Sequence, residues 1–270
     1  MVRLNFVAAI LFMFQRLKLN KEPLIRNKMK KLIFISIVLF VSCVSQKPSD
    51  EIKLEIRSNQ EATGFPITIQ VKKGATFNHP TFAIWVEDLE GNYIETLFVT
   101  KSIATGIFGH GELTPGKWSN VPGAVRRPAA LPYWSHKRNI QAPDGLYTPS
   151  PETAVPDAIS GATPTNSFVL KTALSKNPSG EFRILLEVNQ AWDSNLFWVN
   201  NKYTNDTDYF ASLQPSLVYS GTFNPENMEK PVDFATIGHG EPSGKNGTLN
   251  ADISTLTTAK EIFLSIRIEN

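Results

Sequence analysis

Cysteine is almost absent from this sequence: Cys43 is the only one in 270 residues. A single thiol excludes an intramolecular disulfide framework and any zinc or iron–sulfur site built from several thiolates. Four catalytic signatures are missing as well, namely the G-x-S-x-G elbow of hydrolases, the H-E-x-x-H zinc helix, the P-loop and the Rossmann G-x-G-x-x-G turn. The sequence therefore gives no support to these classes of enzyme.

Clustered positive charge is scarce outside the N-terminal region. The chain has 27 basic and 25 acidic residues, of which residues 1–42 hold eight and one, so 19 basic and 24 acidic residues remain in residues 43–270. Nucleic-acid binding requires clustered Lys and Arg, and this acidic remainder has only short basic pairs such as Arg126-Arg127. We therefore expect no nucleic-acid partner.

Long apolar runs are also rare, and the most prominent one is short. It covers residues 32–41, follows the basic start Met29-Lys30-Lys31 and ends just before Ser42 and Cys43. Ten residues span about half of a bilayer's hydrocarbon core, so the run predicts a targeting signal and not a membrane span. The pattern F-V-S-C resembles a bacterial lipobox, in which the cysteine is acylated and becomes the mature N-terminus. The alternative is an inert buried thiol.

This resemblance implies a lipid-anchored protein on the periplasmic or outer-surface side of the cell envelope. Residues 29–42 are then a lipoprotein signal peptide, and Cys43 is the lipidation site. Residues 1–28 have no place in such a signal, so they are predicted to be a mis-assigned upstream extension, with a cytoplasmic extension as the alternative. The polar residues 43–50 are predicted to be a tether, and residues 51–270 a single domain.

The expected domain has the period of β-strands. Apolar residues alternate with polar ones, and no window of twelve residues keeps a helical period of 3.6. The predicted fold class is all-β, an antiparallel β-sandwich with a long Pro-rich insertion. Strands are expected in residues 52–56, 67–71, 83–86, 93–99, 168–170, 183–188, 196–199, 216–219 and 262–268.

The insertion covers residues from about 112 to 166 and holds nine of the eighteen prolines. Proline removes donors from a ladder, so this segment cannot form the interior of a sheet. Its aromatic residues, among them Trp118, Tyr133, Trp134 and Tyr147, favour order over disorder. We expect the insertion to fold against the sandwich and to build a site.

The sharpest motif lies within the insertion, in residues 157–165, DAISGATPT. It resembles the covalent flavin-attachment motif D-x-x-S/T-G-A-S/T-x-T of the sodium-pumping NADH:quinone reductase and related electron-transfer subunits. In those proteins a flavin transferase joins FMN through its phosphate to the hydroxyl of the last threonine. The resemblance implies that Thr165 is the attachment point, with a recognition frame formed by Asp157, Ser160, Gly161, Ala162 and Thr163.

A hydroxyl that another enzyme modifies must be presented on an exposed and sharply turning loop. Gly161 and Pro164 favour such a turn. The alternative is an ordinary turn whose hydroxyl groups cap local backbone.

A short motif occurs twice: GHGELTPGK in residues 109–117 and GHGEPSGK in residues 238–245. A His and a Glu two positions apart in extended backbone point to the same face. If the copies converge, two imidazoles and a carboxylate could hold a metal ion, the candidate ligands being His110, Glu112, His239 and Glu241. The alternative is that the glycines mark tight strand ends and each His is hydrogen-bonded locally. His136 is a further candidate ligand or a packing residue.

At the scale of the whole domain, the chain resembles a family of periplasmic proteins known as domain of unknown function 2271. The resemblance is carried by FAIWVED in residues 82–88, GNYIETL in residues 91–97, RPAALPYWSH in residues 127–136, QPSLVY in residues 214–219, GHG in residues 238–240 and STLTTAK in residues 254–260. It implies an association with membrane flavin-reductase-like proteins and flavin transferases, and no established activity. The pattern D-x-x-G-x-x-I-x-T-L in residues 88–97 also resembles the immunoglobulin-like domain of flagellar hook-capping proteins. This second resemblance implies an immunoglobulin-like β-sandwich and no flagellar role.

Two functions therefore remain open. The first is a cell-envelope lipoprotein that carries covalent FMN and transfers electrons, with a flavin transferase and a membrane redox protein as partners. Such a protein is an electron carrier more than a stand-alone enzyme. The second is a non-catalytic periplasmic β-sandwich module that binds a metal ion or a small ligand through the repeated motif.

Overall fold

The computed structural model describes residues 52, 54–109, 111–114, 117–177, 179–227 and 230–269, and the compact unit that it forms covers Ile52–Asn270. The predicted extension, signal peptide and tether, with Cys43, lie outside the described residues, as does His110. Among the described helices, none is long and apolar enough to cross a membrane.

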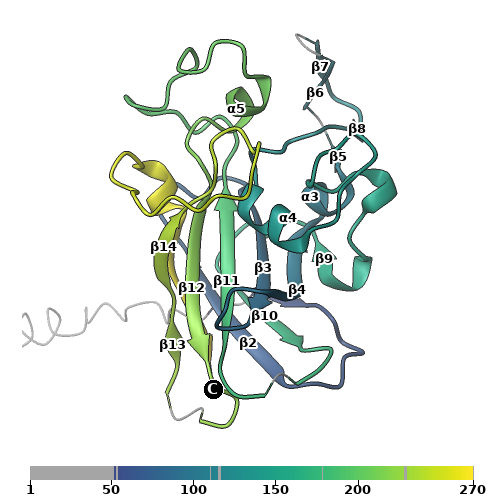
Figure 1. Ribbon diagram of the computed structural model, residues 1–270, viewed down its shortest axis with the longest axis vertical. Coiled ribbons are helices and arrows are strands. Elements are labelled where there is room, and N and C mark those ends of the chain that lie inside the picture. Colours follow the sequence, from purple (N-terminus) through teal and green to yellow (C-terminus); the bar gives the residue numbers. More distant parts are fainter. Residues whose placement is uncertain are drawn as a thin grey trace, which may run out of the picture. The chain divides into compact units, whose positions relative to one another are not determined.

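The fold is mostly β, with two large sheets and few helices (Figure 1). The five-stranded sheet has the order β1 (Leu54–Arg57), β10 (Phe168–Ala173), β2 (Pro66–Lys73), β15 (Phe263–Glu269) and β13 (Val232–Asp233). The six-stranded sheet has the order β14 (Ala235–His239), β12 (Leu217–Phe223), β11 (Phe182–Asn189), β3 (Thr81–Glu87), β4 (Tyr93–Thr100) and β9 (Ser160–Gly161).

Most neighbouring strands are antiparallel, but β1 pairs with β10 and β4 pairs with β9 in parallel. Two further pairs form small separate sheets: β5 (Ile107–Phe108) with β8 (Gly123–Ala124), and β6 (Gly111–Thr114) with β7 (Lys117–Ser119). The helices are α3 (Lys101–Thr105), α4 (Pro132–Arg138) and α5 (Thr207–Ser212), with short 3-10 turns η1 (Pro151–Thr153), η2 (Asp157–Ile159) and η3 (Thr258–Glu261).

The main core draws side chains from both large sheets. Phe82 of β3 stacks on Phe168 of β10 with 5.5 Å between ring centroids, a contact between strands of different sheets. Strand β3 is buried along most of its length, because Phe82, Ile84 and Val86 face this core while Ala83 and Trp85 face a second cluster. A strand covered on both faces becomes a continuous apolar run, which is the pattern of this segment.

The second cluster joins the insertion to the other face of the six-stranded sheet. Trp134 of α4 and Leu131 are buried beside Trp85 and Val99 of the sheet, and Figure 1 shows α3 and α4 over the β3 and β4 end. Pro132 begins α4, the position where proline costs no helical hydrogen bond. The part of the insertion around α4 therefore packs on the six-stranded sheet.

Eight of the nine predicted strands are confirmed, with boundaries that differ by a few residues. The prediction for residues 196–199 is wrong. This segment is irregular because the side-chain Oδ1 of Asn195 accepts hydrogen bonds from the backbone N–H groups of Phe197 and Trp198, at 2.8 and 2.7 Å. Asn side chains commonly replace a ladder with such a local turn.

Candidate functional site

Residues 157–165, which resemble a flavin-attachment motif and are called the flavin-type motif below, lie along one edge of the six-stranded sheet. The motif begins in η2 and continues into β9, where Ser160 pairs with Val99 and Gly161 with Thr100. In the described part of the chain, no strand lies beyond β9 in this sheet. The motif therefore occupies an outer position, which another protein can approach.

Asp157, the first residue of the motif, faces solvent. Its side chain is 84% exposed and lies 3.4 Å from Nζ of Lys101. An ion pair between two such exposed groups adds little to stability. The Asp157 carboxylate can therefore separate from Lys101 at little cost.

Gly161 packs closely against the ring of Phe98. A Cβ atom added to Gly161 would lie 3.0 Å from Cε2 and 3.3 Å from Cζ of that ring, inside the usual contact distance between carbon atoms. Phe98 is itself buried and stacked on Phe82. The motif glycine thus has a local structural role, since a larger residue would push β9 away from β4.

The remaining frame residues differ in exposure. The Ser160 hydroxyl oxygen is buried and has no hydrogen-bond partner among the described residues. Ala162 is exposed, Thr163 is half-buried and Pro164 is buried. This part of the motif therefore contains both buried and solvent-exposed side chains.

Thr165 lies in a bend between β9 and β10 and is exposed. Pro164 before it is buried, and the side chain of Asn166 after it accepts a hydrogen bond from the backbone N–H of Ser167 at 2.8 Å. The bend is held on both sides of the threonine. Thr165 is therefore presented to solvent in this bend.

A hollow of about 290 Å³ lies beside the first half of the motif. Its lining includes Ile159 and, from β4, Tyr93 and Glu95. The Tyr93 hydroxyl shares a hydrogen bond of 2.8 Å with Thr96, and burial raises its pKa. Glu95 accepts hydrogen bonds from the backbone N–H and the hydroxyl of Ser175. These polar groups are therefore engaged within the protein.

The second copy of the repeated motif is a tightly packed corner. His239 is buried, and its Nδ1 lies 2.7 Å from the carbonyl oxygen of Gly240, so Nδ1 carries the proton. The Glu241 carboxylate accepts hydrogen bonds from the backbone N–H groups of Ser243 and Lys245, at 3.2 and 2.7 Å. Only Nε2 of a neutral His239 ring keeps a lone pair for a metal ion.

The structure describes only part of the candidate metal site. The backbone of Glu112 lies on β6, but His110 is outside the described residues, so the convergence of the two copies stays a prediction. Within the described residues, no three His, Cys, Asp or Glu side chains gather closely enough to hold a metal ion. His136 packs against Tyr147 with ring centroids 4.4 Å apart, and its Nδ1 contacts the Pro132 carbonyl oxygen at 2.8 Å.

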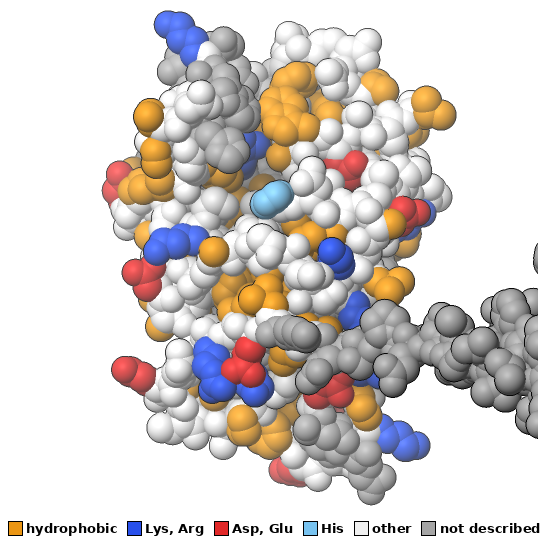
Figure 2. All heavy atoms as spheres, turned by 180° about the vertical axis from the view of Figure 1, so that it is seen from behind, with side chains coloured by type: hydrophobic (Ala, Val, Ile, Leu, Met, Phe, Trp, Pro, Cys, Tyr) orange, Lys and Arg blue, Asp and Glu red, His pale blue; other side chains and the backbone are white. Residues whose placement is uncertain are grey.

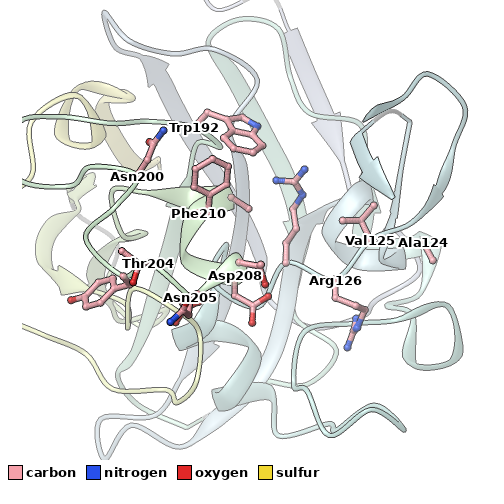
Figure 3. A pocket seen from close by; sticks show the side chains of 14 residues that line it. Ala124, Val125, Arg126, Trp192, Asn200, Thr204, Asn205, Asp208 and Phe210 are labelled. Carbon is pink, nitrogen blue, oxygen red and sulfur yellow. The ribbon is translucent and has the colours of Figure 1, made fainter. Parts of the chain in front are cut away.

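A larger cleft, of about 810 Å³, is absent from the sequence-based expectations. Residues 124–127 of the insertion line one side, and residues between 192 and 211, including part of α5, line the other. Figure 3 shows Trp192 and Phe210 together at one end, with ring centroids 5.0 Å apart. The available signal was the density of aromatic residues in 192–210, which the wrong strand prediction for residues 196–199 obscured.

Comparison with protein-family models, with curated proteins and with solved structures found no match to this chain. The resemblances seen in the sequence therefore stay predictions.

Proposed function

We propose that this protein is a lipid-anchored electron carrier of the cell envelope that holds FMN covalently on Thr165. The observation that carries the proposal is the placement of the motif. Its specified residues form one continuous segment at a sheet edge, and the threonine that corresponds to the acceptor is exposed in a held bend. A buried threonine, or one inside a ladder, would not be open to a transferase.

The attachment reaction needs an activated flavin donor, and a flavin dinucleotide is such a donor. The Thr165 hydroxyl oxygen attacks the phosphorus of the FMN half, so the new O–P bond replaces the bond to the nucleotide leaving group. The hydroxyl proton passes to a base of the transferase, and AMP departs. This chain supplies the nucleophile and its position, while the transferase supplies the catalysis.

The attached flavin would supply the redox chemistry. This chain's own part is to orient the attachment point and to bring it to the membrane surface. The lipid predicted on Cys43 and the polar tether in residues 43–50 would keep the domain close to a membrane redox partner. Tethering of this kind raises the effective concentration of the partner without any new contact surface.

We also infer that the two large sheets form an immunoglobulin-like β-sandwich. The stacking of Phe82 on Phe168 and the core shared by both sheets support this arrangement. An experimental structure in which the sheets do not face each other would contradict it.

The flavin proposal is tested by co-expressing the protein with a flavin transferase and measuring its intact mass. The expected product carries one FMN less one water and fluoresces in a denaturing gel. Thr165→Ala should abolish the adduct, whereas Thr165→Ser, which keeps a hydroxyl, should retain some of it. Thr248→Ala removes an exposed threonine from another loop and should leave the adduct unchanged.

An adduct that persists in Thr165→Ala contradicts the assignment of this residue. Unmodified wild-type protein contradicts the proposal as a whole, provided that the same transferase modifies a known substrate in the same cells. The remaining hypothesis would then be a ligand-binding or metal-binding module. Elemental analysis of the His110→Ala/His239→Ala variant tests that hypothesis, which requires bound metal to fall.

A further inference from the structure

The large cleft has features of a ligand site that the flavin proposal does not use. Its volume of about 810 Å³ lies within the range of about 300–1,000 Å³ that ligand pockets commonly have. Three aromatic side chains in its lining are exposed: Trp192 by 41%, Tyr203 by 42% and Phe210 by 36%. Figure 2 shows hydrophobic side chains at several places on one face of the molecule, with one group near its upper end.

The aromatic pair is held in an open arrangement. The rings of Trp192 and Phe210 meet edge to face, at an interplanar angle of 82°, which covers only part of each ring. Trp192 has a φ of 63°, a left-handed conformation that costs energy in a residue with a side chain. A hydrogen bond of 3.2 Å from its backbone N–H to the carbonyl of Ala211 fixes this conformation. The fold thus maintains a strained backbone that presents the indole at the cleft.

Most charged groups in the lining already have partners within the protein. Arg126 forms a two-point ion pair with Asp144, with Nε at 2.6 Å from the carboxylate. Asp206 accepts hydrogen bonds from Nζ of Lys245 at 2.8 Å and from the backbone N–H of Tyr209 at 2.9 Å. The guanidinium of Arg127 lies 4.9 Å from the ring centroid of Phe108. These groups do not offer a ready anion site.

The neutral polar side chains of the lining, in contrast, have no hydrogen-bond partners in the described part of the chain. Within the described part of the chain, no hydrogen bond engages the side chains of Asn200, Thr204, Asn205 and Thr207. The Asp208 carboxylate is also without a hydrogen bond there, and burial together with Asp206 raises its pKa. Figure 3 places Thr204, Asn205 and Asp208 on the side of the cleft away from Trp192. Amide, hydroxyl and carboxyl groups together can both donate and accept hydrogen bonds.

We propose that this cleft binds a neutral oligosaccharide, with Trp192 and Phe210 as the stacking platform. A pyranose ring has an apolar C–H face that packs on an aromatic ring, and its hydroxyl groups both donate and accept hydrogen bonds. An anionic ligand would meet the carboxylate of Asp208, and a cationic ligand would meet the guanidinium of Arg127. A neutral, hydroxyl-rich ligand can pack its apolar face on the aromatic rings at one end of the cleft. Its hydroxyl groups can form hydrogen bonds with the polar side chains at the other end.

Binding is tested by isothermal titration calorimetry of the full mature chain with cellohexaose, maltohexaose, xylohexaose and chitohexaose. At least one of these should bind, with an affinity that is the same at low and high salt. Trp192→Ala should weaken binding by about tenfold or more, and Trp192→Phe should recover part of the loss. Leu264→Ala removes a 74% exposed side chain from β15 and should have no effect.

Asp208→Asn gives a second variant that keeps the volume of the cleft, and it should weaken binding without lowering the melting temperature. Thr165→Ala should bind like the wild type, because the site is independent of the flavin proposal. The inference is overturned if none of the four oligosaccharides binds, or if Trp192→Ala and Asp208→Asn both bind as tightly as the wild type. Salt-sensitive binding of inorganic phosphate or tetramethylammonium, in place of the oligosaccharides, would also overturn it.

Discussion

The carboxylate of Glu187 caps helix α4: its Oε2 accepts a hydrogen bond of 2.7 Å from the backbone N–H of Trp134. Its Oε1 accepts two more, from the N–H of Tyr133 at 3.2 Å and from the hydroxyl of Ser216 at 2.5 Å. Leu131 occupies the N-cap position and has no side-chain oxygen to offer. The free N–H groups of the first helical turn are therefore satisfied by a strand of the sheet, and Glu187 joins the insertion to β11.

Glu187 makes the stability of the fold depend on pH. Burial raises its pKa from 4.5 to about 7, against the opposing effect of the hydrogen bonds from Ser216 and Trp134. The folded state therefore binds more protons than the unfolded state between these values. The contribution of Glu187 to stability is full below about pH 4.5 and is lost as the pH rises through about 7, with a total of up to about 3 kcal/mol.

Urea unfolding over a series of pH values measures this effect. The free energy of unfolding should decrease with pH in this window for the wild type, and Glu187→Gln should flatten the decrease because it removes the titrating group. Glu90→Gln changes an exposed carboxylate in the turn between β3 and β4 and should keep the wild-type slope. Equal slopes for the wild type and Glu187→Gln would contradict the assignment.

Gly240→Ala should strongly destabilise the protein. An added Cβ atom would lie 2.5 Å from Oγ of Ser216, 2.6 Å from Cγ of Pro132 and 2.9 Å from Oε1 of Glu187. Relief of these overlaps must displace α4 or its cap, at an expected cost of about 2 kcal/mol or more. Chemical denaturation measures the change. Gly109→Ala is the control, because its methyl group meets no atom of the described residues within 4 Å. An equal effect of the two substitutions would show that the predicted overlap is not the cause.

Gly161→Ala should have a smaller and local effect. Its methyl group would press on the ring of Phe98 at 3.0 Å, and we expect a loss of about 1 kcal/mol with weaker pairing of β9 to β4. Hydrogen–deuterium exchange should show faster exchange in residues 157–165 and unchanged exchange in β11. Wild-type protection of β9 in this variant would be incompatible with the expected displacement of the strand.

Cys43→Ser should move the protein from the membrane fraction to the soluble fraction. The lipid predicted on Cys43 is the proposed attachment to the membrane. Fractionation and detergent phase partitioning measure the change. If the serine variant remains in the membrane fraction, the lipidation hypothesis is wrong.

The strand pattern could be predicted because alternation is a local property. Ile67, Ile69 and Val71 point to one face of β2, and a period of two residues is enough to recognise that. The strand prediction for the apolar run in residues 196–199 was wrong, because the side chain of Asn195 satisfies two backbone N–H groups of that run by itself. The sequence alone does not show whether such a local turn or a strand ladder is the more stable arrangement.

The sequence by itself determined the β-rich class and the position of the motif in residues 157–165, because each depends on residues close together in the chain. Only the tertiary structure decided that Glu187 caps α4, that Phe98 limits the size of residue 161, and that Trp192 and Phe210 meet at a cleft facing residues 124–127. These relationships join segments that are distant in sequence. Their partners are chosen by the packing of the whole unit, so no local pattern records them.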